Sequence, residues 1–236
     1  MLENLDRNIW VARKPSRYLG LEVGTRMTVI RCNNNDLILI SPIAKDDNLI
    51  QEIDRLGRVK WIIAPNLYHH LFLSGFQENY PDAQLLAVPG LEKKRPDLAI
   101  AKILDPNQSS VADELESIFF EGFKVLDLTG VSLLNEFAFF HHKSKSLILT
   151  DTAFAFDETF PLLTRLAARF LRSYKQLSPS LLEKIATQEK DKVKISIQKV
   201  LKWNFKRVIV AHGNIIENEA KEQLKKGYEW FLGMTL

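Results

Sequence analysis

The sequence contains almost no cysteine and no long apolar run. Cys32 is the only cysteine among the 236 residues, so no disulfide can form within the chain. A single thiol suits a reducing compartment, and we expect a cytoplasmic location. No stretch of roughly 18 or more apolar residues occurs, which argues against a membrane-spanning helix. Residues 1–6 carry acidic side chains and no apolar segment, so they do not look like a secretory signal.

The chain also lacks a strong excess of either charge. Its formal net charge is only +3, and no block of Lys and Arg stands out. Nucleic acid is therefore not expected as a partner, and a small-molecule substrate or ligand is the favoured alternative. No repeat, low-complexity segment or Gly/Ser linker interrupts the sequence. With 46% hydrophobic residues available for a core, we predict a single domain over residues 1–236.

Short apolar runs alternate with helical patterns along the chain. One helix is predicted from Asp46 or Asp47 to Gly57, others through Phe76 and after Asp157, and a last one over residues 217–231. This order predicts two α/β halves whose sheets pack face to face with helices outside, an α+β sandwich with four αββα layers. The predicted strands are 8–12, 26–31, 36–40, 60–64, 84–88, 117–120, 124–128, 136–140, 146–150 and 207–211.

Three predicted strands lead directly to side chains that bind metals. His69 and His70 follow the run 59–64, Asp151 follows the run 147–150, and His212 follows the run 208–211. A buried strand holds the residue after it at the rim of the fold, where functional sites are commonly built. Histidine nitrogen and carboxylate oxygen are ligands for zinc and iron. Asn66, in the same loop as His69, is a candidate donor to a bound oxyanion.

These strand ends, in this order, resemble the metallo-β-lactamase fold superfamily. Leu149-Thr150-Asp151 is similar to the strand whose Asp bridges two metals, and Ala211-His212-Gly213 is similar to the strand that ends in the last His ligand. The resemblance covers most of the chain. It implies the αββα sandwich and a metal-dependent hydrolase activity.

The main motif of that superfamily, HxHxDH, is only fragmentary here. Its place is taken by residues 64–70, which read APNLYHH, so that either His69 or His70 corresponds to its final His. The superfamily's middle histidine would fall within residues 128–132, where this sequence has none. The pattern resembles a diverged branch that lacks the full motif. We therefore expect one divalent metal, zinc or iron, rather than a dinuclear site.

Two functions from different classes are compatible with this pattern. In the first, His69 or His70 or both, with Asp151 and His212, hold a metal that serves hydrolysis of a small ester-like or phosphorylated substrate. In the second, the scaffold has lost the dinuclear site and binds a ligand or partner without catalysis. Structural roles compete with both functions, because an Asp after a strand is commonly a helix N-cap and an Asn after Pro commonly satisfies turn backbone.

Three further features carry weaker expectations. His141 and His142 precede the turn 143–145, and we expect a solvated hairpin corner there. Asp157 and Glu158 are expected to open a helical region. Residues 160–177 combine an apolar stripe with four basic and no acidic residues, which favours an outer helix packed on the sheet with a solvated basic face. Alternatives for this helix are contact with an acidic partner or an anionic membrane surface, or, as part of the segment 158–203, a cover over the site.

Overall fold

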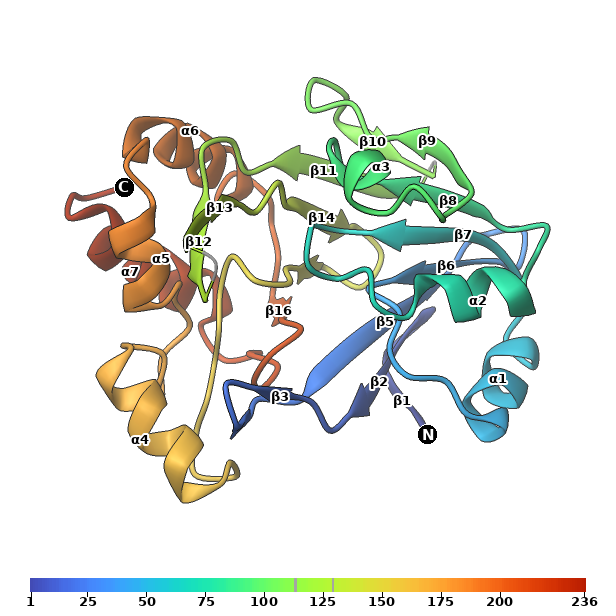
Figure 1. Ribbon diagram of the computed structural model, residues 1–236, viewed down its shortest axis with the longest axis horizontal. Helices are drawn as coiled ribbons and strands as arrows, with labels where there is room; N and C mark the ends of the chain where they lie inside the picture. Colours follow the sequence, from blue (N-terminus) through green and yellow to red (C-terminus); the bar gives the residue numbers. More distant parts are fainter. Residues whose placement is uncertain (113, 129) are drawn as a thin grey trace.

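Two β-sheets lie face to face in the computed structural model, which describes residues 1–112, 114–128 and 130–236 (Figure 1). The first sheet is antiparallel from β1 to β6 and parallel from β6 to β9. Its strands, in spatial order, are β1 (Leu2–Asp6), β2 (Ile9–Lys14), β5 (Thr25–Arg31), β6 (Asp36–Ile40), β7 (Arg58–Ala64), β8 (Gln84–Ala87) and β9 (Ile100–Ile103).

The second sheet is antiparallel except for its last pair, in which β15 and β16 run parallel. Its strands, in spatial order, are β10 (Ser110–Val111), β11 (Leu115–Phe119), β14 (Phe137–His141), β15 (Ser146–Ile148) and β16 (Arg207–Ile209). Two small hairpins lie outside both sheets: β3 (Arg17–Tyr18) with β4 (Leu21–Glu22), and β12 (Lys124–Asp127) with β13 (Gly130–Leu133).

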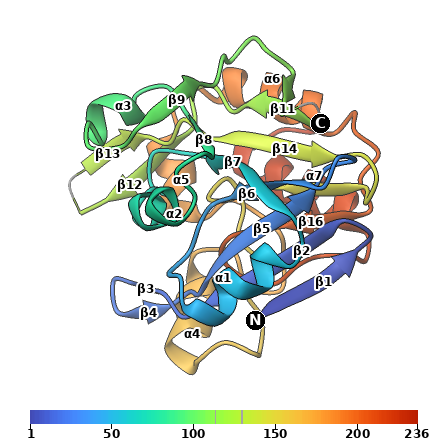
Figure 2. The same cartoon turned by 90° about the vertical axis from the view of Figure 1, so that its right-hand side faces the viewer.

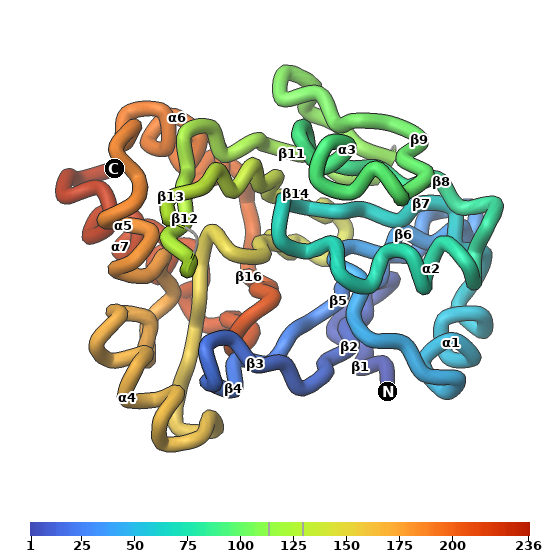
Figure 3. The backbone as a smooth tube through the Cα atoms, viewed as in Figure 1, coloured from blue at the N-terminus to red at the C-terminus, as the bar shows by residue number. Residues whose placement is uncertain are grey.

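Helices cover the outer faces of the two sheets (Figure 2). On the first sheet, the Asp46 side chain caps α1 by accepting a hydrogen bond from the amide of Leu49 at 2.8 Å. The N-terminus lies beside this sheet, and the C-terminus lies beside α6 and α7 of the second half (Figure 3). The helices are α1 (Asp47–Asp54), α2 (Leu73–Asn79), α3 (Leu91–Lys94), α4 (Leu162–Phe170), α5 (Leu181–Ala186), α6 (Lys190–Val200) and α7 (Ala220–Leu232).

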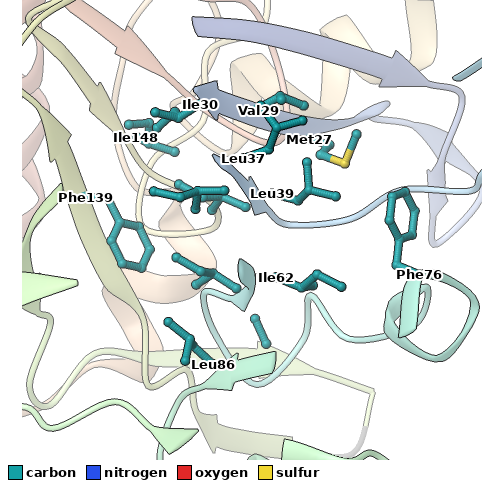
Figure 4. Packing of buried hydrophobic residues seen from close by; sticks show 14 of the residues in the cluster. Met27, Val29, Ile30, Leu37, Leu39, Ile62, Phe76, Leu86, Phe139 and Ile148 are labelled. Atoms are coloured by element: carbon teal, nitrogen blue, oxygen red, sulfur yellow. The ribbon is translucent and has the colours of Figure 1, made fainter. Parts of the chain in front are cut away.

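The side chains of the second sheet point alternately to its two faces, so this sheet contributes to two hydrophobic cores. Phe139 and Ile148 point into the core shared with the first sheet, which Figure 4 shows around Ile30, Leu37 and Ile62. Their strand neighbours Phe140, Leu147 and Leu149 point the other way, into the core under α6 and α7. Because successive side chains of a strand face opposite sides, a sheet covered on both faces needs this continuous apolar pattern. The predicted αββα sandwich is confirmed.

Two local predictions were wrong. The pair Asp157 and Glu158 does not open a helix, because α4 begins only at Leu162, after Pro161. The turn at 143–145 is confirmed, but the hairpin corner is not fully solvated: His141 is buried while His142 is exposed. In the segment 128–132, where the superfamily's middle histidine would fall, Thr129 lies outside the described residues.

The sequence predicted that the apolar stripe of residues 160–177 would pack on the sheet, and this prediction was wrong. The helix itself covers Leu162–Phe170 and buries the small side chains of Thr164 and Ala168, whereas four large apolar side chains of the stripe face solvent. Among the described residues, no helix is both long and apolar enough to cross a membrane.

Candidate metal centre

Three of the predicted ligands meet where strands of the two sheets end. Parallel pairing sets Ile148 opposite Ile209, so Asp151 and His212 each stand three residues beyond the same rung of the ladder. His69 arrives from the other sheet, in the loop that follows β7. Its Nε2 lies 3.3 Å from an Asp151 carboxylate oxygen, and the Nε2 of His212 lies 3.3 Å from the other. Within the described part of the chain, these three residues form a group whose ligand atoms lie within 4.8 Å of one another.

The hydrogen bond made by His212 determines which of its nitrogens is available. Its Nδ1 lies 2.6 Å from the main-chain oxygen of Gly24, which can only accept a hydrogen bond. Nδ1 must therefore carry the proton. In the neutral imidazole this leaves Nε2 with a lone pair that points at Asp151 and His69.

His69 is oriented in the same way by Ser41, the residue that follows β6. The Nδ1 of His69 lies 2.6 Å from the Ser41 hydroxyl, and its Nε2 faces the Nε2 of His212 at 3.2 Å. A serine hydroxyl accepts a hydrogen bond from Nδ1–H as readily as it donates one, so both imidazoles can present Nε2 lone pairs to the same point.

The donor set fits a divalent metal ion. Two nitrogen lone pairs and a carboxylate that converge in this way repel one another unless a cation, either a proton or a metal, lies between them. Ligand atoms that are each about 2.0–2.1 Å from a tetrahedral zinc ion are about 3.3 Å apart. The Nε2 atoms of His69 and His212, 3.2 Å apart, have this spacing, and each lies 3.3 Å from a different oxygen of the Asp151 carboxylate. Two imidazoles and a carboxylate are also ligands that zinc and iron accept.

The pKa values of Asp151 and His69 reflect the same mutual attraction. Burial alone raises the pKa of Asp151, but the neighbouring His69 and His212 outweigh it and hold this pKa well below its usual range. Burial likewise lowers the pKa of His69, while the charge of Asp151 raises it above the ordinary value on balance. The carboxylate thus stays ionised and favours a positive partner.

Glu136 positions Asp151 through hydrogen bonds to the backbone. This fully buried carboxylate accepts hydrogen bonds from the amides of Thr150 at 2.8 Å and Asp151 at 2.7 Å. The Thr152 hydroxyl donates to it at 2.6 Å. The Glu136 carboxylate thus holds the backbone of the turn after β15, and this restricts the direction in which Asp151 points.

Asn66 connects this turn to the loop that carries His69. Its side-chain amide donates to Glu136 at 2.8 Å and to Asp151 at 2.8 Å, and its side-chain oxygen accepts from the amide of His69 at 2.9 Å. The side chain is fully buried, and both amide protons have protein acceptors. Substrate binding by Asn66 thus stays a prediction from the sequence, while the structure engages this side chain in holding two of the three candidate ligands.

His70 does not join the group formed by His69. Its Nδ1 lies 3.1 Å from an Arg95 guanidinium nitrogen, which also donates to the His70 main-chain oxygen at 2.9 Å. Burial, with the charges of Lys94 and Arg95, lowers the pKa of His70 to about 4. A neutral imidazole held by Arg95 lies beside the site but outside the converging ligands.

The strand end that carries His212 is secured by Arg26 of β5. This buried guanidinium donates to the main-chain oxygens of Val210 and Gly213, one on each side of His212. Gly213 has φ +110°, and a Cβ there would lie 2.3 Å from the main-chain oxygen of Ala155. Only glycine permits both this backbone conformation and this approach.

A cavity of about 420 Å³ opens onto the three side chains. Its walls come from the β3–β4 hairpin, β12, and the helices α4 and α5, and are mostly apolar. Tyr68 lines it and donates to Asp127 at 2.9 Å, and burial raises the pKa of Tyr68 to about 12, so its hydroxyl keeps its proton. A cavity of this size accommodates a small molecule.

Glu136, Ser41 and Arg26 were not found from the sequence. Ser41 directly follows the predicted strand 36–40, so the strand-end argument used for Asp151 applied to it as well. Glu136 and Arg26 begin predicted strands as charged residues next to apolar runs, a position that ordinarily faces solvent. Only the tertiary contacts reveal that both are buried.

The fold and the site together define a protein of the metallo-β-lactamase fold. The chain belongs to the family described as "Domain of unknown function (DUF4336)", whose model matches residues 6–176. No curated protein matches the chain.

Similar solved structures cover nearly all of the chain at low identity. The DIM-1 metallo-β-lactamase is 16% identical, with a TM-score of 0.68 over 98% of this chain and 97% of that one. FIM-1 from Pseudomonas aeruginosa in its mono-zinc form is 10% identical, with a TM-score of 0.62 over 98% and 96%. The Flv1 flavodiiron core from Synechocystis sp. PCC6803 is 14% identical, with a TM-score of 0.67 over 99% of this chain and 60% of that one. These identities agree with a diverged branch of the fold.

Proposed function

We propose that this protein is a metal-dependent hydrolase that holds one divalent ion, zinc or iron, with His69, Asp151 and His212. The observation that carries the proposal is the approach of two Nε2 atoms to 3.2 Å beside an ionised carboxylate. The contact of His212 Nδ1 with the Gly24 oxygen at 2.6 Å leaves its Nε2 without a proton when the ring is neutral. Such an arrangement is favourable only with a cation between the groups.

A single ion agrees better with this donor set than two. In the main-motif segment, the Asn66 and Tyr68 side chains are engaged with protein partners, and His70 contacts Arg95. Within the described residues, the group that has the spacing of a metal site contains three members. The fold itself accommodates this, since FIM-1 is described in a mono-zinc form.

When bound, the ion would supply Lewis acidity, polarising a carbonyl or phosphoryl group and acidifying water. Three protein ligands would leave room on the ion for water or substrate. The chain's own residues would do the rest. Ser41 and the Gly24 oxygen fix the two imidazoles, and Glu136 and Asn66 fix the carboxylate. The mostly apolar cavity walls favour a small ester-like or phosphorylated substrate with an apolar part.

Metal content tests this proposal directly. The protein is purified without chelators, bound zinc, iron and manganese are quantified, and zinc binding is then titrated for the wild type, Asp151→Ala and His212→Ala. About one ion per chain is expected in the wild type, with affinity at least 100-fold weaker in both variants. The matched control is His142→Ala, which removes an imidazole outside the site. Substoichiometric metal that neither site substitution changes would exclude the metal centre.

The second candidate is a non-catalytic scaffold that binds a ligand or partner in the same cavity. The observation in its favour is that a shared proton can replace the metal, since the pKa of His69 is raised by Asp151. A panel of generic esters, thioesters and phosphodiesters with the zinc-loaded and iron-loaded protein separates the two. Turnover that Asp151→Ala abolishes supports the hydrolase, whereas metal binding without turnover of any substrate class supports the scaffold.

A further inference from the structure

Helix α4 is amphipathic in the reverse sense of an ordinary outer helix. Its buried side chains are the small Thr164 and Ala168, and Thr164 is tied to the protein by a 3.0 Å hydrogen bond to the Glu22 oxygen. Its large apolar side chains share the opposite face and are between 52% and 75% exposed. These four residues are Leu162, Leu163, Leu166 and Phe170. An unpartnered face of this kind in a stable fold marks an interaction surface.

Further exposed apolar side chains lie on other segments that line the cavity. Most of the exposed large apolar side chains in the described part of the chain lie on α4 or on three other segments, and all four segments contribute residues to the cavity lining. The exceptions are Met1, Ile185 and Ile195. The three segments are the β3–β4 hairpin with Tyr18 and Leu19, the loop with Leu71 and Phe72, and the β12–β13 hairpin with Leu128, Val131 and Leu133. We call these four segments the mouth surface. Figure 1 shows α4 and β3 at the same edge of the molecule.

Positive charge accompanies the mouth surface. Between Glu158 and Glu183 the sequence contains Arg165, Arg169, Arg172 and Lys175 and no acidic residue. Arg165 and Arg169 flank Leu166 at helical spacing, so they border the apolar stripe. Lys175 forms an ion pair with Glu158 at 3.0 Å. Arg169 instead lies over the ring of Tyr174, and among the described residues it forms no ion pair with a carboxylate.

We propose that the mouth surface docks on an anionic lipid bilayer, with Leu162, Leu163, Leu166 and Phe170 inserted at the headgroup boundary. Leu and Phe on one face, bordered by Arg, are the features by which a helix lies in a membrane interface. Each basic residue near an anionic surface adds attraction. A second copy of the chain fits less well, because a two-fold interface would bring the Arg165 and Arg169 of both copies together with no acidic residue of α4 to pair them. This docking goes beyond the proposed hydrolase function and does not depend on it.

Vesicle sedimentation with the full chain tests the docking. We expect the protein to sediment with vesicles of phosphatidylcholine plus phosphatidylglycerol, and far less with phosphatidylcholine alone or at high salt. The double variant Leu163→Ser/Leu166→Ser should lower the partition coefficient about tenfold. The matched control is Ile195→Ser on α6, because Ile195 is 55% exposed, close to the 52% of Leu166, but lies outside the mouth surface. Circular dichroism confirms that the variants are folded.

Three outcomes would overturn the docking proposal. The first is no sedimentation with either vesicle, and the second is sedimentation that the double variant leaves unchanged. The third is a dimer in light scattering that the double variant dissociates, which would assign the surface to a second copy. Repeating the sedimentation with chelator should leave it unchanged, so failure of the metal centre and failure of docking are distinguishable.

Discussion

The two ends of the second sheet each carry histidines close to carboxylates, yet they differ in what the histidines face. At the hairpin end, His141 contacts the Ser144 hydroxyl at 2.8 Å, and the exposed His142 contacts Glu116 at 2.6 Å. At the other end, His212 and Asp151 follow adjacent parallel strands and meet His69 of the first sheet.

The difference shows that two histidines adjacent in the sequence, such as His141 and His142, do not by themselves form a candidate metal site. At the hairpin end each histidine contacts one polar side chain: His141 contacts Ser144 of the same turn, and His142 contacts Glu116 of the adjacent strand β11. The carboxyl ends of parallel strands, in contrast, deliver side chains from distant parts of the chain to one edge, where they can face the same point. Substitutions at the two ends test this contrast.

Removal of the Glu136 carboxylate should have the largest effect on stability. Glu136→Ala leaves the buried amides of Thr150 and Asp151 without their acceptor, and we expect a loss of about 4–5 kcal/mol in the free energy of unfolding. At the hairpin end, Glu116→Ala removes a partly exposed acceptor of His142 and should cost well under half of that. Urea unfolding measures both. Equal losses would remove the distinction between the two ends.

A methyl group at Gly213 should destabilise the strand end that carries His212. Because φ is +110° and the added Cβ would meet the Ala155 oxygen, Gly213→Ala should cost about 3–4 kcal/mol and weaken zinc binding. At the hairpin, Lys145 also has a positive φ, of 51°, but is exposed. There the reverse change, Lys145→Gly, should be neutral or slightly stabilising. Thermal unfolding and zinc titration of both variants decide whether the effect is specific to the site end.

His141 should make the hairpin end sensitive to acid. Burial lowers its pKa from 6.5 to about 4, so the folded protein binds this proton less tightly than the unfolded chain. The associated stability is fully present above pH 6.5 and is lost as the pH falls toward 4. The loss for the wild type over this window should exceed that of His141→Gln by roughly 2–3 kcal/mol. His142→Gln serves as the exposed control. Parallel curves for the wild type and His141→Gln would contradict the prediction.

The serine partners of His69 and His141 should differ in their effect on metal binding. Ser41→Ala removes the 2.6 Å contact that orients His69, and zinc affinity should fall about tenfold. Ser144→Ala removes the 2.8 Å contact of His141 and should leave zinc affinity unchanged. Isothermal titration of the two variants provides the comparison. A fall in both, or in neither, would mean that the hydroxyl of Ser41 does not orient a ligand.

Much of the fold was predictable because its signals are local. The apolar runs that became β6, β7 and β16 and the Asp46 cap of α1 are short-range patterns. Helix α4 was misjudged because its apolar stripe predicts burial on a sheet, whereas packing used Thr164 and Ala168 instead. His141 was misjudged because burial of a hairpin corner depends on its neighbours and not on turn chemistry.

In the candidate site, the linear pattern of residues was enough to predict that Asp151 and His212 follow buried strands and that a histidine follows β7. Strand ends can be located from a linear pattern, since a strand is a run of consecutive residues. Tertiary structure decided the choice of His69 over His70 as the convergent residue, the pairing of Asp151 with His212, and the burial of Glu136 and Arg26 around them. These outcomes depend on register between distant strands and on which way one loop residue turns, and both are set by packing across the two sheets.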